Sequence, residues 1–190
     1  MPTALFFGSF NPVHVGHLVI ADYFARTLGE TWMVCSPHNP HKQRSTLAND
    51  YDRLALLELG IGNNPRLRAS NVEFALPKPS YTVDTLAVLR ERYPKREFAL
   101  IMGGDNLLSL PKWKNPDEIL AHHDIHVYVR PGYEVGGPYA SHPRVHLHRD
   151  VPTMQISSSY IRKQIAAGEE VRYLMPEPVR LEIEGKGLYR

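Results

Sequence analysis

The chain of 190 residues predicts an α/β fold: a doubly wound parallel sheet with helices on both faces. Short apolar runs typical of buried strands alternate with segments that carry apolar residues at helical spacing. This alternation favours parallel strands joined by right-handed crossovers. The chain has no internal repeat, low-complexity tract or linker, so we expect a single domain over residues 1–190. Residues 157–190 are expected to form a C-terminal helical part of that domain.

The predicted strands are short and mostly apolar. TALFFG (3–8) ends at a glycine, and EFALIMGGDN (97–106) is a strand that runs into a glycine turn. Further strands are predicted at 31–36, 66–74, 124–132 and 144–150. The strand at 66–74 is expected to lie at an edge of the sheet.

The predicted helices fill the intervals between these strands. One begins near Val15 and ends at Gly29, and another over 51–62 takes its N-cap from Asn49 or Asp50. Further helices are predicted at 80–93, 106–110, 115–123 and 157–168, with a last one in the C-terminal tail. Pro116 suits the first position of its helix.

Composition narrows the class of protein. There are 22 basic and 20 acidic residues, a net charge of +2, so we expect no nucleic-acid partner. No apolar run approaches the roughly 20 residues of a membrane span, and the N-terminus lacks the pattern of a signal peptide. The single cysteine, Cys35, fits a reducing compartment, and we expect a cytoplasmic protein without a membrane partner.

The segment GSFNPVHVGH (8–17) follows the first predicted strand directly. Gly8 permits close approach of a ligand, and Ser9 and Phe10 offer backbone N–H groups to phosphate oxygens. His14 and His17 are three residues apart at a helix start, so their side chains face the same way. On these residues alone, phosphate binding and plain surface capping both remain open.

A second segment, MQISSSYIRKQI (154–165), places serines at another helix start. Ser157 to Ser159 can cap that helix and donate to an anion, and Arg162 lies on the same side with a guanidinium suited to phosphate. The alternative is a serine N-cap beside a surface arginine. Two such helix ends in one α/β chain favour the binding of a polyphosphate, one end on each helix.

These two segments resemble the signatures of the nucleotidylyltransferase superfamily with the H-x-G-H motif. Within it, the chain looks like the bacterial nicotinate-nucleotide adenylyltransferases, and the likeness extends over nearly the whole length. It includes the segments PHNPHK (37–42), PSYTVDTL (79–86), IMGGDNLLSLPKWK (101–114), VYVRPGY (127–133), ISSSYIR (156–162) and LMPEPVRLEIEGKGLYR (174–190). The resemblance implies a Rossmann-like nucleotidylyltransferase fold.

The resemblance implies transfer of AMP from ATP to nicotinate mononucleotide by direct in-line attack, a step of NAD biosynthesis that yields deamido-NAD and pyrophosphate. Mg²⁺ would assist, and no dedicated protein metal site is expected. His17, His14 and Arg162 are the expected catalytic residues. The expected ATP-binding residues are Gly8, Ser9, Phe10, His14, Gly16, His17, Lys42, Gly103, Asp105, Ile156, Ser157, Ser158 and Arg162. Asp105 can also cap the helix 106–110.

For the mononucleotide, the resemblance points to Ser9, Phe10, Tyr81, Thr82 and Trp113. Trp113 would stack on the pyridine ring. Backbone N–H groups at the helix start formed by Tyr81 and Thr82 would favour the acid over the amide.

The sequence also allows other interpretations of the function. The acceptor could instead be nicotinamide mononucleotide or pantetheine phosphate, or the protein could be a nucleotide-binding sensor without catalysis. Histidines gather in two groups that could hold zinc, although a solvent-facing strand is the plainer explanation for 146 and 148. These residues are His122, His123 and His126, and His142, His146 and His148. A homo-oligomer is also possible.

Overall fold

The computed structural model describes residues 1–37 and 47–190, and its strands form one six-stranded sheet. The strands are β1 Thr3–Gly8, β2 Glu30–Cys35, β3 Leu67–Ser70, β4 Phe98–Gly103, β5 Ile125–Tyr128 and β6 Val145–His148. Their order is β3-β2-β1-β4-β5-β6, and every neighbouring pair is parallel. The predicted doubly wound parallel sheet is therefore confirmed, with β3 at one edge.

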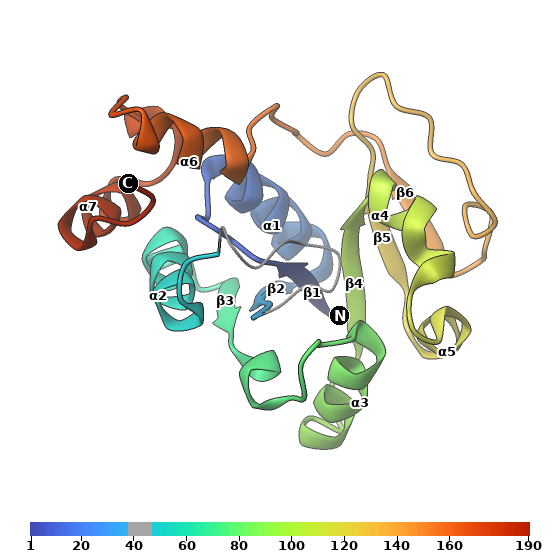
Figure 1. Ribbon diagram of the computed structural model, residues 1–190. Helices are drawn as coiled ribbons and strands as arrows, with labels where there is room; N and C mark the ends of the chain where they lie inside the picture. The colour runs from blue at the N-terminus through green and yellow to red at the C-terminus, as the bar shows by residue number, and fades with distance from the viewer. Residues whose placement is uncertain (38–46) are drawn as a thin grey trace.

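Helices follow the strands as the apolar spacing predicts (Figure 1). The α-helices are α1 Val15–Leu28, α2 Asp50–Ile61, α3 Thr82–Arg92, α4 Gly104–Ser109, α5 Pro116–His122, α6 Ser158–Ala166 and α7 Glu177–Lys186. Short 3₁₀ helices lie at η2 Val72–Ala75, η3 Leu110–Lys112 and η4 Arg172–Leu174. Gly29 caps α1 and Asn49 caps α2, where the Asn49 side chain accepts a bond from the Tyr51 N–H.

Some predicted boundaries are wrong, and the strand predicted over 124–132 already ends at Tyr128. The strand predicted over 66–74 ends at Ser70, and the chain turns into η2. The helix predicted over 106–110 begins earlier, at Gly104, because extended Gly103 is its N-cap. Asp105 therefore lies inside the first turn of α4 and does not cap it.

Each face of the sheet is covered by its own helices. Side chains alternate between faces along a strand, so Phe6 joins the core under α1 and α2 while Leu5 joins the core under α3. The first core includes Phe24 of α1, Leu56 of α2, Ile161 of α6 and Val179 of α7. The second includes Leu86 of α3, Leu107 of α4 and Ile119 of α5. Figure 1 shows the two groups of helices on opposite sides.

The direction of winding reverses between β1 and β4. The chain adds β2 and β3 on one side of β1 and then β4, β5 and β6 on the other. In open parallel sheets, ligands bind in the crevice outside the carboxyl ends of the strands at this reversal. β1 ends there at Gly8 and β4 at Gly103, so both glycine turns singled out in the sequence meet at one place. Within the described ranges, no helix combines the length and apolar character that crossing a bilayer requires.

Candidate active site

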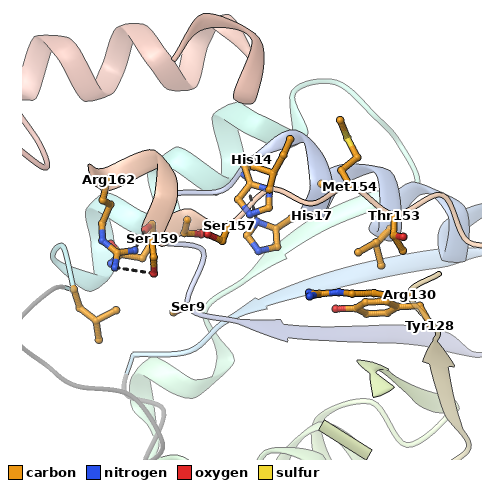
Figure 2. Close-up of a pocket in the computed structure, with 16 residues that line it drawn as sticks. Ser9, His14, His17, Tyr128, Arg130, Thr153, Met154, Ser157, Ser159 and Arg162 are labelled. Atoms are coloured by element: carbon orange, nitrogen blue, oxygen red, sulfur yellow. Dashed lines mark hydrogen bonds between the residues drawn. The ribbon is translucent and has the colours of Figure 1, made fainter. Parts of the chain in front are cut away.

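The first signature forms the start of α1. His14 is the N-cap, and its backbone N–H donates to Nδ1 of His17 across 3.3 Å. The two imidazole rings stack with centroids 3.7 Å apart and an interplanar angle of 23° (Figure 2). The prediction that both histidines face the same way is confirmed.

The two histidines differ in burial. His14 is 4% exposed, whereas His17 is half-buried. Burial lowers the pKa of His14 from 6.5 to about 4, since a charged imidazole is poorly solvated there. His14 is therefore a neutral ring near pH 7, able to donate one hydrogen bond but not to add a full positive charge to the site.

The second signature forms the start of α6 and binds the first. Ser157 is the N-cap, and its hydroxyl accepts from the Tyr160 N–H at 3.2 Å. The Ser158 hydroxyl donates to the Pro12 carbonyl at 2.9 Å, and Nη1 of Arg162 donates to the Asn11 carbonyl at 2.8 Å. The two helix starts are thus held against each other, which the sequence argument requires.

A cavity of about 480 Å³ opens between these helix starts. His14, Gly16 and His17 line it from α1, and Arg162 lines it from α6, with Ser9 below them (Figure 2). The remaining lining residues are Asn11, Ile20, Leu47, Tyr128, Arg130, Thr153, Met154, Ile156, Ser157, Ser158 and Ser159. Of the residues predicted to bind ATP, eight therefore share one cavity: Ser9, His14, Gly16, His17, Ile156, Ser157, Ser158 and Arg162.

The structure gives Gly8 a different role from the predicted one. A Cβ at Gly8 would lie 2.8 Å from the ring of Phe10, so that ring fills the space expected for a ligand. Phe10 is 1% exposed and packs edge-on against His17, with centroids 5.2 Å apart. Its side chain therefore supports the imidazole and does not face the cavity.

At the end of β4, Gly103 and Asp105 lie outside the lining of this cavity. A Cβ at Gly103 would lie 2.6 Å from Oδ1 of Asp105 and 3.1 Å from the Tyr128 hydroxyl. Burial raises the pKa of Tyr128, and the nearby Arg130 opposes that shift. Arg130 lies alongside Tyr128 at the cavity wall (Figure 2). The Asp105 carboxylate and the Tyr128 hydroxyl thus both lie close to Gly103 at the end of β4.

Of the residues predicted for the mononucleotide, Tyr81 and Thr82 lie at the start of α3, Trp113 lies at the end of η3, and Ser9 lines the cavity already described. Tyr81 is the N-cap of α3 and Thr82 its first residue, as predicted. Nζ of Lys114 lies 4.9 Å from the centre of the Tyr81 ring and 2.8 Å from Oδ2 of Asp84. The neighbouring Trp113 is half-buried, and its indole N–H donates to the Ser109 hydroxyl at 3.3 Å. Apart from Ser9, none of these side chains lines the cavity described above.

Several lining residues were missed from the sequence. Tyr128 and Arg130 belong to VYVRPGY, a segment that carries the resemblance, so that signal was available. Asn11 and Ser159 lie inside the two signatures, next to residues whose types bind phosphate more commonly. Met154 is the first residue of the second segment, and Thr153 carries no pattern that marks it. The predicted Lys42 lies outside the described residues.

The histidine groups do not form a metal site in the described part of the chain. No three His, Cys, Asp or Glu side chains gather there in a way that could hold an ion. His126 and His148 bond to each other instead, with Nδ1 and Nε2 2.9 Å apart. His146 is exposed, as expected for a solvent-facing strand position, whereas His148 is half-buried and packs edge-on against Phe24.

Comparison with known proteins agrees with this geometry. The model of the cytidylyltransferase-like family matches residues 5–164. Two relatives, from Flavobacterium johnsoniae and Flavobacterium psychrophilum, are 45% and 43% identical over the full length of both chains. Each carries the name "Probable nicotinate-nucleotide adenylyltransferase".

Solved structures share the fold. A Plasmodium falciparum nicotinic acid mononucleotide adenylyltransferase complexed with NaAD has a TM-score of 0.81 and 17% identity, covering 99% of this chain and 97% of its own. The same enzyme complexed with APC has a TM-score of 0.80, also at 17% identity, covering 99% of this chain and 96% of its own. Sequence, fold and the paired helix ends thus lead to one assignment: the chain belongs to the cytidylyltransferase-like family, within the group of nicotinate-nucleotide adenylyltransferases.

Proposed function

We propose that the protein transfers AMP from ATP to nicotinate mononucleotide, giving deamido-NAD and pyrophosphate in NAD biosynthesis. The observation that carries the proposal is the contact between the two signatures. Ser158 and Arg162 bind the carbonyls of Pro12 and Asn11, so the starts of α1 and α6 flank one cavity. Both helix starts favour negative charge, which suits a chain of phosphates.

In the proposed reaction, an oxygen of the mononucleotide 5′-phosphate attacks the α-phosphorus of ATP. The bond from that phosphorus to the bridging oxygen of the β-phosphate breaks, and its electron pair leaves with pyrophosphate. Such a transfer depends on positioning and charge stabilisation. A protein nucleophile is not required, and Cys35 fits this view because burial raises the pKa of its thiol to about 11.

Different residues of the cavity are assigned to different phosphates of ATP. We assign His17 to the α-phosphate, where it stabilises charge in the transition state, with neutral His14 as a second donor. Ser157, Ser158 and Arg162 bind the β- and γ-phosphates that leave. The other proposed ATP contacts are Ser9, the backbone N–H of Phe10, Gly16, Lys42, Gly103, Asp105 and Ile156, whereas Gly8 makes room for the Phe10 ring.

The mononucleotide is assigned to the start of α3. Backbone N–H groups of Tyr81 and Thr82 face the acid group, and Trp113 stacks on the pyridine ring. Ser9 and Phe10 lie between the two substrates at the end of β1. The positive end of α3 supports a preference for nicotinate over nicotinamide.

Mg²⁺ fits this site as a companion of ATP. The described residues offer no cluster of three metal-binding side chains, so phosphate oxygens and water would hold the ion. The ion would neutralise charge on the phosphates, while Arg162 and the start of α6 hold the pyrophosphate. The whole chain then acts as one nucleotidylyltransferase domain, with 157–190 as its C-terminal helical part, and we place the reaction in the cytoplasm.

The test is a coupled assay of pyrophosphate release from ATP with each candidate acceptor in turn. We expect release with nicotinate mononucleotide, less with nicotinamide mononucleotide, and none with pantetheine phosphate. Preference for either alternative acceptor would reassign the substrate. ATP binding without any release of pyrophosphate would leave a nucleotide sensor in place of an enzyme.

A further inference from the structure

Arg53 of α2 is a buried cation that the proposed reaction does not use. Its side chain is fully buried near the ends of β1 and β2. At these ends, backbone carbonyls just beyond the strands accept hydrogen bonds from the guanidinium. Nη1 donates to the carbonyls of Ser9 and Ser36, the latter at 2.9 Å. Nε donates to the Ala48 carbonyl at 3.2 Å.

The remaining donors of Arg53 complete the set. Nη2 donates to the Pro37 carbonyl at 3.4 Å and to Oδ1 of Asp50 at 2.7 Å. A guanidinium presents five N–H donors in a rigid plane, whereas a lysine ammonium presents three. The pocket around Arg53 is therefore built for a guanidinium, and the Asp50 carboxylate balances its charge.

The Ser9 carbonyl matters because the next residue is strained. Phe10 has φ of +43°, in the left-handed region that side chains with a Cβ rarely adopt. Such a conformation persists where its surroundings hold it from several directions. A planar peptide bond joins Ser9 to Phe10, so a fixed Ser9 carbonyl also fixes the direction of the Phe10 N–H.

Phe10 in turn contacts the imidazole assigned to catalysis. Its ring packs edge-on against His17 with centroids 5.2 Å apart, and against Phe6 at 5.9 Å. The contacts thus run in sequence from Arg53 to Ser9, through the Ser9–Phe10 peptide, to His17. We propose that Arg53 is a positioning residue that holds the Ser9–Phe10 peptide and, through the Phe10 ring, sets the position of His17.

This inference rests on the proposed adenylyl transfer. It predicts that loss of the Arg53 contacts lowers kcat much more than it changes KM for ATP. In Arg53→Lys, fewer donors reach the carbonyls, and the Ser9–Phe10 peptide relaxes. A displacement of about 1 Å at reacting groups can cost about 10²-fold in rate. We expect kcat to fall about 10- to 100-fold while KM for ATP changes less than threefold, because α6 still binds the leaving phosphates.

The matched control separates positioning from folding. Leu57 lies on the same helix and is fully buried in the apolar core, and its side chain carries no hydrogen-bonding group, so Leu57→Ala destabilises α2 without releasing Ser9. Both variants are assayed at 15 °C, below their own melting temperatures. We expect Leu57→Ala to lower the melting temperature and keep wild-type kcat. Equal kcat losses in the two variants would reduce Arg53 to a structural residue and overturn the proposal.

A second pair of variants decides the matter if Arg53→Lys does not fold. Asp50 is paired with Arg53 through Oδ1 and with Lys78 through Oδ2, each within 3.0 Å. Asp50→Asn loosens the guanidinium, and we expect kcat to fall at least threefold. Lys78→Met removes the outer ion pair, and we expect wild-type kcat. Wild-type kcat in Asp50→Asn would overturn the proposal, whereas an inactive wild-type enzyme would instead overturn the proposed function.

Discussion

The proposed ATP region is more preorganised than the proposed mononucleotide region. On the ATP side, the starts of α1 and α6 are joined by hydrogen bonds, and stacked imidazoles line a cavity of about 480 Å³. On the mononucleotide side, Tyr81 is 36% exposed and its neighbours Lys114 and Asp84 form an exposed ion pair. The first region is held by part-buried hydrogen bonds between the two helix starts, and the second by an exposed ion pair of a kind that contributes little to stability.

This difference has a physical reason. Phosphates are stabilised by donors that are fixed before the charge develops, because a fixed donor costs no reorganisation during the reaction. A flat ring can be bound by one or two aromatic faces on a more open surface. We therefore expect substitutions on the ATP side to change mainly kcat, and substitutions on the mononucleotide side to change mainly KM.

The largest effect is expected for His17→Ala. Loss of a preorganised donor at the α-phosphate should lower kcat by about 10²–10³-fold. The measurement is pyrophosphate release at saturating ATP and nicotinate mononucleotide. His122→Ala, at an exposed histidine of α5, is the control and should match wild type. A His17→Ala enzyme with near-normal kcat would remove His17 from the chemistry.

A smaller effect is expected from pH, again on the ATP side. The pKa of His14 is about 4 when folded and near 6.5 when unfolded, so the unfolded chain binds more protons between these values. The free energy of unfolding should therefore decrease as pH falls from about 6.5 to about 4. At about 1.4 kcal/mol per pKa unit, His14 accounts for about 3 kcal/mol of that decrease.

Denaturant unfolding between pH 4 and pH 7 checks this prediction. His14→Asn keeps a good N-cap but cannot titrate, so its profile should be flatter than that of wild type. It should not be flat, because burial also lowers the pKa of His126 to about 4. A His14→Asn profile as steep as that of wild type would show that the buried imidazole is not the source.

The smallest effect is expected for Trp113→Ala on the mononucleotide side. Loss of a stacking partner worth about 1 kcal/mol should raise KM for nicotinate mononucleotide about fivefold. KM for ATP should stay unchanged, because Trp113 lies outside the cavity at α1 and α6. Tyr133→Ala, at an aromatic residue that is 68% exposed, is the control. Equal rises in both KM values would contradict the division into two regions.

Much of the fold could be predicted because its signals are local. Apolar spacing marked α1 from Val15, Asn49 and Gly29 marked helix ends, and the glycines after β1 and β4 marked the ligand-binding edge. Capping and helix spacing involve residues within a few positions of each other, so they can be recognised before the chain is folded. The same holds for the imidazole pair, whose common direction follows from its separation of three residues.

The contacts within the site could not be predicted, because they join segments that are far apart in the sequence. Arg162 binds the Asn11 carbonyl from 151 positions away, and Ser158 binds Pro12 from 146 positions away. Arg53, which reads as an ordinary helix residue in the sequence, is fully buried against Ser9, and Phe10 occupies the space that Gly8 leaves. By itself, the sequence determined the strands, helices and caps, since these follow from short-range spacing. Tertiary structure alone decided which carbonyls meet which donors, because that depends on how the whole sheet winds.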